Sequence, residues 1–158
     1  MNDVLKIITQ AKKLEDSAAI LFNKGINDPT KYFISGWILA ALSIELYLKA
    51  IALKENGGYK KVHNISVLFG ELKPETKATL ENFLKIEIEK YDLEFQHRKN
   101  LIENITQFTI SNNVYDILND LSTLFVDFRY IFQEQQPRSF YYIEPIRIVL
   151  ENYTKDFK

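Results

Sequence analysis

An apolar run from Tyr32 to Leu53 with two charges inside it, Glu45 and Lys49, sets the strongest limit on how this chain can fold. A run of roughly 20 apolar residues is long enough to cross a bilayer. Two full charges in its interior argue against a membrane span, because ions are costly in lipid. The uninterrupted part, Phe33 to Ile44, has the length of a buried core helix. We therefore expect a core helix and no membrane partner.

Hydrophobic periodicity divides the chain into helices, and no strand alternation lasts more than a few residues. Cap residues, prolines and glycines mark where the helices start and stop. The residues between 92 and 111 fit more than one boundary. We predict an all-α fold in one domain, residues 1–158, with six or seven helices around a buried central helix, 29–55. The expected helices are Asn2 to Lys24, one capped by Asp28 with Pro29 in its first turn, a short one capped by Asn64, one opened by Pro74, one capped by Ser111, and one with Pro145 near its start.

Composition excludes several classes of function. The formal net charge is -1, so nothing in the overall charge attracts nucleic acid or anionic lipid. With no cysteine, the chain has no disulfide, no thiol chemistry and no cysteine-ligated zinc, which fits a reducing cytosol. The first residues lack the pattern of a secretory leader, so we expect a cytoplasmic protein. We find no phosphate-binding glycine loop, no dinucleotide fingerprint and no motif for sequence-specific DNA binding, and we expect no cofactor.

Glu45 and Lys49 need partners if their helix is buried, because an unpaired buried ion costs several kcal/mol. The two charges stand four residues apart and can pair with each other, which is worth a few tenths of a kcal/mol on an exposed surface. Arg129 is a second candidate, since apolar neighbours one turn away would hold its stem. We predict a buried polar network of Glu45, Lys49 and Arg129, in which Glu45 accepts from Arg129 while Lys49 reaches outward or to a carbonyl.

Three short stretches stand out: "SIELYLKAIA" in the central helix, "HNISVLFGEL" after its glycine turn, and "FVDFRYIF" in a later helix. Together they resemble the motifs of the HEPN superfamily of small prokaryotic helical domains. That family has an S-x-E-x-x-x-K-A segment on its second helix, then a His-Asp-Leu motif, and in many members an Arg-Tyr pair on a later helix. The chain departs in the second motif, where Asn64 replaces the Asp. The matching residues are Ser43, Glu45, Lys49 and Ala50 in the first motif, His63 and Ile65 in the second, and Arg129 and Tyr130 in the third.

The resemblance implies a helical bundle, often a two-fold dimer, in a family whose catalytic branch comprises metal-independent RNases. Those enzymes use an Arg, four to six residues and then a His near a helix start. Here the histidines are His63 and His97, and the first arginine in the chain is Arg98, with Glu103 or Asn104 where the His would stand. Asn cannot act as a general base, so the departure argues against catalysis. If the chain is an enzyme, its catalytic candidates are Arg98, Glu103, His97 and Arg129.

Binding candidates come from two places where positive charge adjoins aromatic rings, the mixture that single-stranded nucleic acid favours. They are Lys60, Lys61 and His63 in one stretch, and Arg138, Tyr141 and Tyr142 in another. His63 also suits a capping or packing role before a helix start. His97 is expected at the surface, and the scattered histidines make a metal site improbable.

These observations favour a non-catalytic HEPN-like binding module that works through homodimerisation and an RNA or protein partner, with its contact surface at the exposed edges of residues 125–142. A divergent metal-independent RNase of the toxin kind is the first alternative. The second is a helical partner subunit of a separately encoded nucleotidyltransferase, an arrangement that the family resemblance permits.

Overall fold

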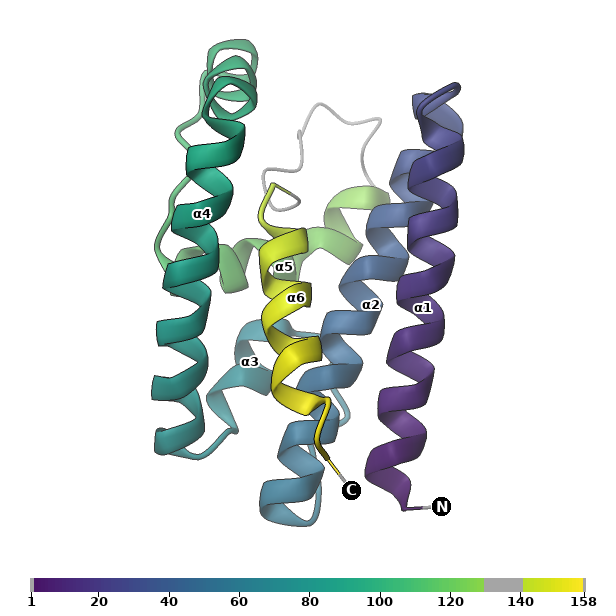
Figure 1. Ribbon diagram of the computed structural model, residues 1–158, viewed down its shortest axis with the longest axis vertical. Coiled ribbons are helices and arrows are strands. Elements are labelled where there is room, and N and C mark those ends of the chain that lie inside the picture. The colour runs from purple at the N-terminus through teal and green to yellow at the C-terminus, as the bar shows by residue number, and fades with distance from the viewer. Residues whose placement is uncertain (1, 130–140, 158) are drawn as a thin grey trace.

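The computed structural model describes residues 2–129 and 141–157, without the side chains of residues 29, 30, 106 and 124–129. Within these ranges the chain forms six helices and no strand (Figure 1), which confirms the all-α prediction. Tyr130 and Arg138 lie outside the described residues. The helices are α1 (Asp3–Gly25), α2 (Pro29–Asn56), α3 (Ile65–Gly70), α4 (Pro74–Thr106), α5 (Val114–Arg129) and α6 (Ile143–Thr154).

Helix α2 is the central helix, as predicted. It packs against α1, α3, α5 and α6, and its second half supplies much of the core, including Ile44, Tyr47 and Leu48. In the described part of the chain, Lys31–Asn56 is the one helical segment long and apolar enough to cross a membrane by length and composition. Because 61% of its apolar window is buried within the bundle, the segment has the character of a core helix.

Most of the predicted helix boundaries are confirmed by their caps. The side chains of Asn2 and Asn64 accept hydrogen bonds from Val4 N at 3.0 Å and from Val67 N at 2.8 Å. Helix α2 ends at Gly57, whose φ of 71° is left-handed and suits glycine. Asp28 occupies the N-cap position of α2 but makes no side-chain capping hydrogen bond.

The cap predicted at Ser111 is wrong. The Asn113 side chain accepts from Tyr115 N at 2.9 Å and so caps α5, which starts at Val114. The Ser111 hydroxyl instead accepts from Asn113 N at 3.1 Å and donates to Asp116. Ser111 therefore orders the loop before the helix, because its hydroxyl bonds to the local backbone two residues on.

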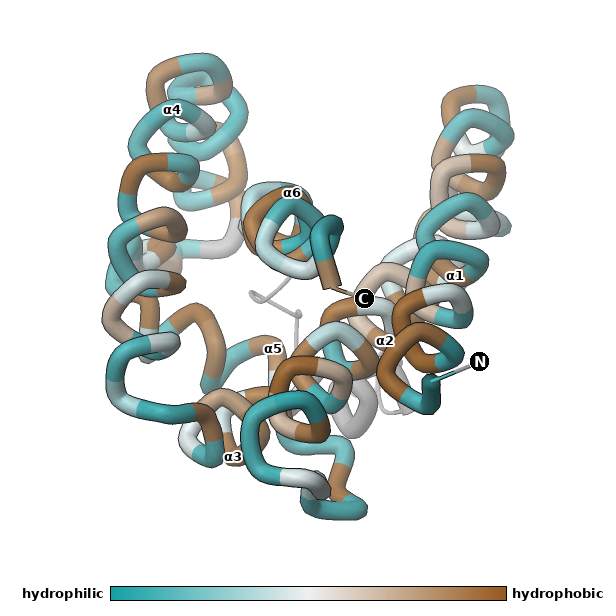
Figure 2. Tube along the Cα trace, turned by 60° about the horizontal axis from the view of Figure 1, so that its bottom comes forward, coloured by the Kyte–Doolittle hydropathy of each residue, from teal (hydrophilic) through white to brown (hydrophobic). Residues whose placement is uncertain are grey.

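Helix α4 resolves the uncertain stretch between residues 92 and 111, because it continues to Thr106. Its stripe of Leu80, Leu84 and Ile88 is buried, as the periodicity predicts. At Phe95 the backbone leaves the helical region, with φ −115° and ψ 22°, and the helix is kinked there. Viewed from below, α1 and α4 stand apart with α6 between them (Figure 2). A cleft lies at the end of the molecule where α1 ends and α2 begins, and residues of α1, α2, α4 and α6 line it.

Candidate functional site

The two charges inside α2 pair with each other. Lys49 Nζ donates to Glu45 Oε1 at 2.6 Å, and His63 Nδ1 lies 3.1 Å from Glu45 Oε2. Both carboxylate oxygens of this buried glutamate are therefore engaged, and Lys49 also lies 5.6 Å from the centre of the Tyr59 ring. The expectation that Lys49 points outward or to a carbonyl is wrong. The Arg129 side chain, predicted as the third member, lies outside the described residues.

Lys60, Lys61 and His63 lie in the exposed loop between α2 and α3. Lys60 forms an ion pair with Glu71 at 2.7 Å, and the His63 side chain is 78% exposed while it contacts Glu45. This loop is at the lower end of the molecule in Figure 1, whereas Tyr141 and Tyr142 precede α6 at the upper end. The fold therefore does not join the two predicted binding stretches into one surface.

Tyr141 and Tyr142 are 5% and 2% exposed, so the prediction that they form an exposed stacking surface is wrong. Their rings contact each other edge to face with centroids 4.8 Å apart, and the Tyr141 ring also packs on Tyr91. Burial raises the pKa of Tyr141 to about 12. Burial and the hydrogen bond to Asp92 raise the pKa of Tyr142 as well. Both hydroxyls therefore stay protonated at neutral pH and act as donors.

These hydroxyls hold the kink in α4. Tyr141 Oη donates to the carbonyl oxygen of Phe95, the non-helical residue, at 3.2 Å. Tyr142 Oη donates to Asp92 at 2.9 Å, and Lys99 Nζ donates both to Tyr142 Oη at 2.7 Å and to Asp92 at 2.9 Å. Asp92 and Lys99 stand on opposite sides of the kink, so this partly buried triad of Asp92, Lys99 and Tyr142 bridges the bend. The two tyrosines thus tie the segment before α6 to α4 at its kink.

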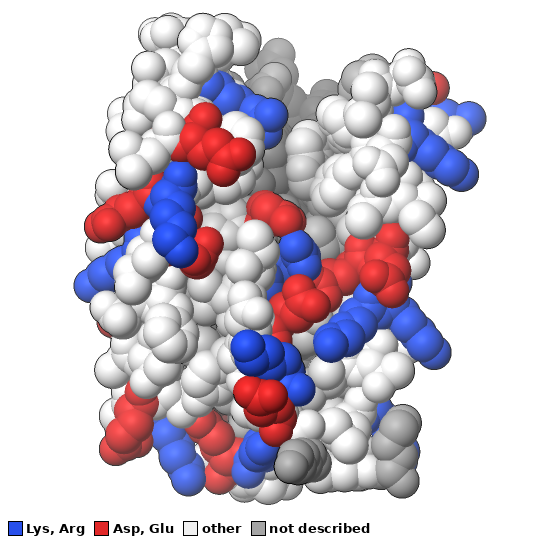
Figure 3. Space-filling view, viewed as in Figure 1, with Lys and Arg blue, Asp and Glu red and all other residues white. Residues whose placement is uncertain are grey.

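Arg98 is the residue that the kink positions. Its guanidinium lies 4.7 Å from the centre of the Phe95 ring and interacts with Tyr91. Together with Tyr91 and Tyr141 it forms one wall of a cleft of about 390 Å³ between α4, α6 and the upper ends of α1 and α2. Figure 3 shows the same face hollowed between the upper parts of these helices. Arg98 is thus the one sequence-predicted catalytic candidate that lines this cleft among the described side chains.

The opposite wall of the cleft is aromatic. Phe22 from α1 and Phe33 and Trp37 from α2 pack together with ring centroids 5.7 to 6.5 Å apart. Two glycines make room for these rings. A Cβ at Gly25 would lie 2.2 Å from the Phe33 ring, and one at Gly36 would lie 2.7 Å from the Phe22 ring. This wall was not predicted from the sequence, because its rings belong to two helices separated by a turn. The glycines opposite the rings were the available signal.

A second hollow of about 390 Å³ adjoins the cleft and shares Phe22, Asn23 and Glu144 with it. Its charges centre on Arg147, which donates to Glu144 at 2.7 and 3.0 Å, to Glu151 at 3.2 Å and to the buried Glu15. The Glu144 hydrogen bonds are the main reason that the pKa of Arg147 is raised. Tyr47 Oη also donates to Glu15, at 2.5 Å. The second hollow is therefore acidic, and its arginine, Arg147, is fully engaged by the surrounding carboxylates.

Of the other catalytic candidates, His97 and Glu103 do not line the cleft, and the side chain of Arg129 lies outside the described residues. His97 is exposed on α4, and Glu103 Oε1 accepts from the backbone N of Ile110 at 2.7 Å, which closes the loop after α4. Within the described ranges, no three His, Asp or Glu side chains are grouped as a metal site. The geometry supports a binding cleft that is lined by aromatic rings and by Arg98.

The family model of the HEPN domain matches residues 4–145, which include all of α1 but its first residue, the whole of α2 to α5 and every described residue that lines the cleft. The chain therefore belongs to the HEPN family, and this bundle is that of a HEPN domain. The resemblance inferred from the three motifs is thereby confirmed. Neither the comparison with curated proteins nor the comparison with solved structures gave a match.

Proposed function

We propose that this HEPN domain is a non-catalytic binding module that acts as a cytoplasmic homodimer and binds RNA by taking up one of its nucleotides in the cleft. The observation that carries the proposal is the meeting of Arg98 with aromatic rings on both walls of one cleft. Aromatic rings stack on nucleobases, and a guanidinium binds phosphate through paired hydrogen bonds. HEPN domains commonly dimerise, which supports the homodimer.

The charges around the cleft favour uptake of a single nucleotide over binding of a long backbone. Arg98 stands at one end, while the adjoining hollow carries Glu15, Glu144 and Glu151. Those carboxylates would repel further phosphates of the RNA, so the RNA backbone must leave the cleft on the Arg98 side. Binding rather than cleavage is proposed because a general base must reach the proton that it removes, and neither His97 nor Glu103 lines the cleft.

The single tryptophan of the chain, Trp37, lines the cleft, so its intrinsic fluorescence reports occupancy directly. Short single-stranded RNA, matching DNA, and free nucleoside monophosphates are titrated into the protein in excess chelator. We expect RNA to quench or shift the emission, and Arg98→Ala to weaken binding about tenfold, the effect of losing about 1.4 kcal/mol of charge-assisted hydrogen bonding. Arg98→Lys, which keeps the charge but not the paired geometry, should lie in between.

Lys61→Ala is the matched control, because it removes an exposed cation from the far end of the molecule. The affinity of this variant for RNA should stay within about twofold of that of the unchanged protein, since a distant exposed charge contributes little to binding in the cleft. Free nucleotides that bind as well as RNA would make the ligand a mononucleotide. No fluorescence response, or equal losses for Arg98→Ala and Lys61→Ala, would refute the cleft and favour a protein partner. RNA cleavage that is lost in folded Arg98→Ala would establish the RNase alternative.

A further inference from the structure

Glu144 is the one carboxylate among the described residues that line the cleft, and phosphate binding by Arg98 does not explain it. Its side chain is 49% exposed, so a ligand in the cleft can reach it. It lies in the first turn of α6, where the helix dipole favours a negative charge. A carboxylate beside a phosphate site weakens the binding of an anion unless the carboxylate contacts another group of the same ligand.

A chain of hydrogen bonds from the core holds this carboxylate in place. Arg147 donates from Nη2 to Glu144 Oε1 at 2.7 Å and from Nε to Glu144 Oε2 at 3.0 Å. Arg147 also donates to Glu15, which is 8% exposed and accepts from the buried Tyr47 hydroxyl at 2.5 Å. A carboxylate oxygen has two lone pairs, so each oxygen of Glu144 keeps a position for one further donor. Glu144 is therefore a fixed acceptor on the rim of the cleft.

Glu144 and Arg98 both act on Tyr91, which lines the cleft with them. Burial raises the pKa of Tyr91, while Arg98 beside it lowers that pKa and the negative charge of Glu144 raises it. The two charges therefore lie near the same hydroxyl group, and the aromatic wall from α1 and α2 lies opposite. A ligand with its phosphate at Arg98 and a ring against the aromatic wall would place the group between the two next to Glu144.

We propose that Glu144 accepts a hydrogen bond from the 2′-hydroxyl of the ribose and so selects ribonucleotides over deoxyribonucleotides in the cleft. In a nucleotide the ribose is the group that lies between the phosphate and the base. A carboxylate offers acceptors alone, so it suits this hydroxyl, a donor that DNA lacks. The inference rests on the proposed function, because it requires the cleft to take up a nucleotide.

The same carboxylate disfavours DNA. With DNA in the cleft, Glu144 would face the sugar without a donor, and its charge would still repel the phosphate. A site built to bind a hydroxyl rejects the analogue that lacks it, because the polar group of the site is then left without its partner. Since Glu144 is about half exposed, water replaces part of the lost hydrogen bond. We therefore expect about tenfold discrimination, near the low end for a hydrogen bond to a charged group.

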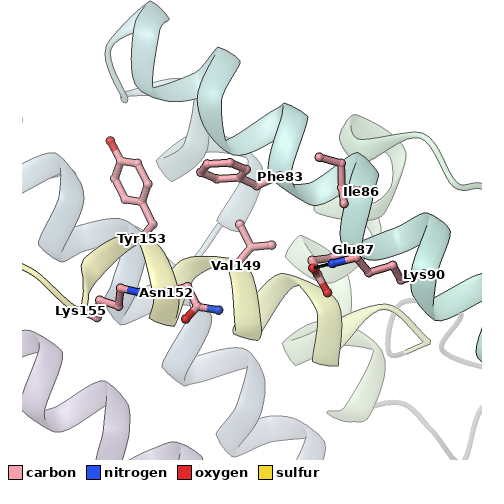
Figure 4. A pocket seen from close by; sticks show the side chains of 8 residues that line it. All are labelled: Phe83, Ile86, Glu87, Lys90, Val149, Asn152, Tyr153 and Lys155. Atoms are coloured by element: carbon pink, nitrogen blue, oxygen red, sulfur yellow. Dashed lines mark hydrogen bonds and ion pairs between the residues drawn. The ribbon is translucent and has the colours of Figure 1, made fainter.

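A groove between α4 and the C-terminal half of α6, the α4–α6 groove, supplies a control site. It measures about 380 Å³, and Figure 4 shows Phe83 of α4 near Tyr153 of α6 there. Glu87 and Lys90 form an ion pair of 2.5 Å on its α4 side. Trp37 does not line this groove, so a ligand bound there leaves the Trp37 emission unchanged. Total binding and binding in the cleft can therefore be measured apart.

The test compares ligands that differ at the 2′ position. Short single-stranded RNA, the same sequence with 2′-fluoro groups, and matching DNA are titrated into the protein in excess chelator. Fluorine cannot donate a hydrogen bond, but 2′-fluoro RNA keeps the sugar pucker of RNA. Trp37 emission reports binding in the cleft, and the anisotropy of labelled RNA reports total binding. The unchanged protein should bind RNA about tenfold more tightly than 2′-fluoro RNA or DNA. If free nucleotides bind as well as RNA, AMP and 2′-deoxy-AMP give the same comparison.

Glu144→Ala should bind RNA and 2′-fluoro RNA within about twofold of each other, because the acceptor is gone. Glu151→Ala is the matched control. Glu151 also accepts from Arg147, at 3.2 Å, but it lines the second hollow and not the cleft, so the variant loses the same charge and should keep the preference for RNA. Glu87→Ala, in the α4–α6 groove, should keep it too. Helical circular dichroism confirms that each variant is folded.

The outcomes separate the two proposals. Binding in the cleft without a preference for RNA over 2′-fluoro RNA, or with a preference that Glu144→Ala leaves intact, would refute the ribose contact and leave the proposed function standing. Equal loss of the preference in Glu144→Ala and Glu151→Ala would also refute the contact, because the hydrogen bonds of Arg147 would then be the cause. Total binding without a Trp37 response, or no binding at all, would refute the cleft itself and the ribose contact with it.

Discussion

Replacing Glu45 by alanine tests whether the fold depends on the ion pair inside its central helix. Glu45 is 3% exposed and accepts from Lys49 at 2.6 Å and from His63 at 3.1 Å. Glu45→Ala leaves the Lys49 ammonium without its counter-charge where its side chain is 11% exposed. Removing one partner of a buried pair costs about 3–5 kcal/mol. Because Lys49 keeps some contact with water and with the Tyr59 ring, we expect about 3 kcal/mol, near the lower end.

Urea unfolding followed by helical circular dichroism measures this cost. A loss of about 3 kcal/mol should lower the midpoint by roughly 1–3 M at an unchanged m-value, and lower Tm by about 6–12 °C for a chain of this size. Protein concentration is held fixed across variants, since self-association would make the midpoint depend on it.

The matched control removes both charges. Glu45→Leu combined with Lys49→Met fills similar volume with apolar groups, and such replacements are close to neutral, so the double variant should lie within about 1 kcal/mol of the unchanged protein. A loss below about 1 kcal/mol for Glu45→Ala, or a double variant less stable than Glu45→Ala alone, would refute the reasoning.

Two further predictions concern pH and capping. The pKa of Tyr142 is raised by burial and by Asp92, so above pH 10 the unfolded chain loses the proton first and the free energy of unfolding falls, by about 1.4 kcal/mol per pH unit for this group. Tyr142→Phe should make that alkaline decline less steep in urea titrations from pH 8 to about 11, and an unchanged slope would contradict the burial argument. Asn64→Ala should cost about 1 kcal/mol because Val67 N loses its cap, whereas Asn64→Asp keeps an acceptor there and should cost little in the same assay. Equal losses for the two variants would count against capping.

Most of the fold could be predicted from the sequence, because hydrophobic periodicity and helix capping depend on residues only a few positions apart. The stripe of α4, the glycine that ends α2 and the cap at Asn64 each depend on neighbours within one or two turns, so the sequence predicts them. The start of α5 shows the limit of such prediction. Ser111 was predicted as the N-cap but Asn113 is the N-cap, because each of several polar residues in a row can cap a helix. The motifs around Glu45 and His63 sufficed to indicate the HEPN family, whose model the chain matches.

Only the tertiary structure decided which of the singled-out residues share a site. Arg98 faces Trp37 across a cleft although 60 positions separate them in the chain, and the kink that aims Arg98 depends on Tyr141 from beyond α5. Tyr141 and Tyr142 have the composition of a binding surface, yet they are buried because Asp92, Lys99 and the Phe95 carbonyl offer them partners. Long-range packing sets whether Tyr141 and Tyr142 are buried or exposed, and the local sequence around them does not encode it.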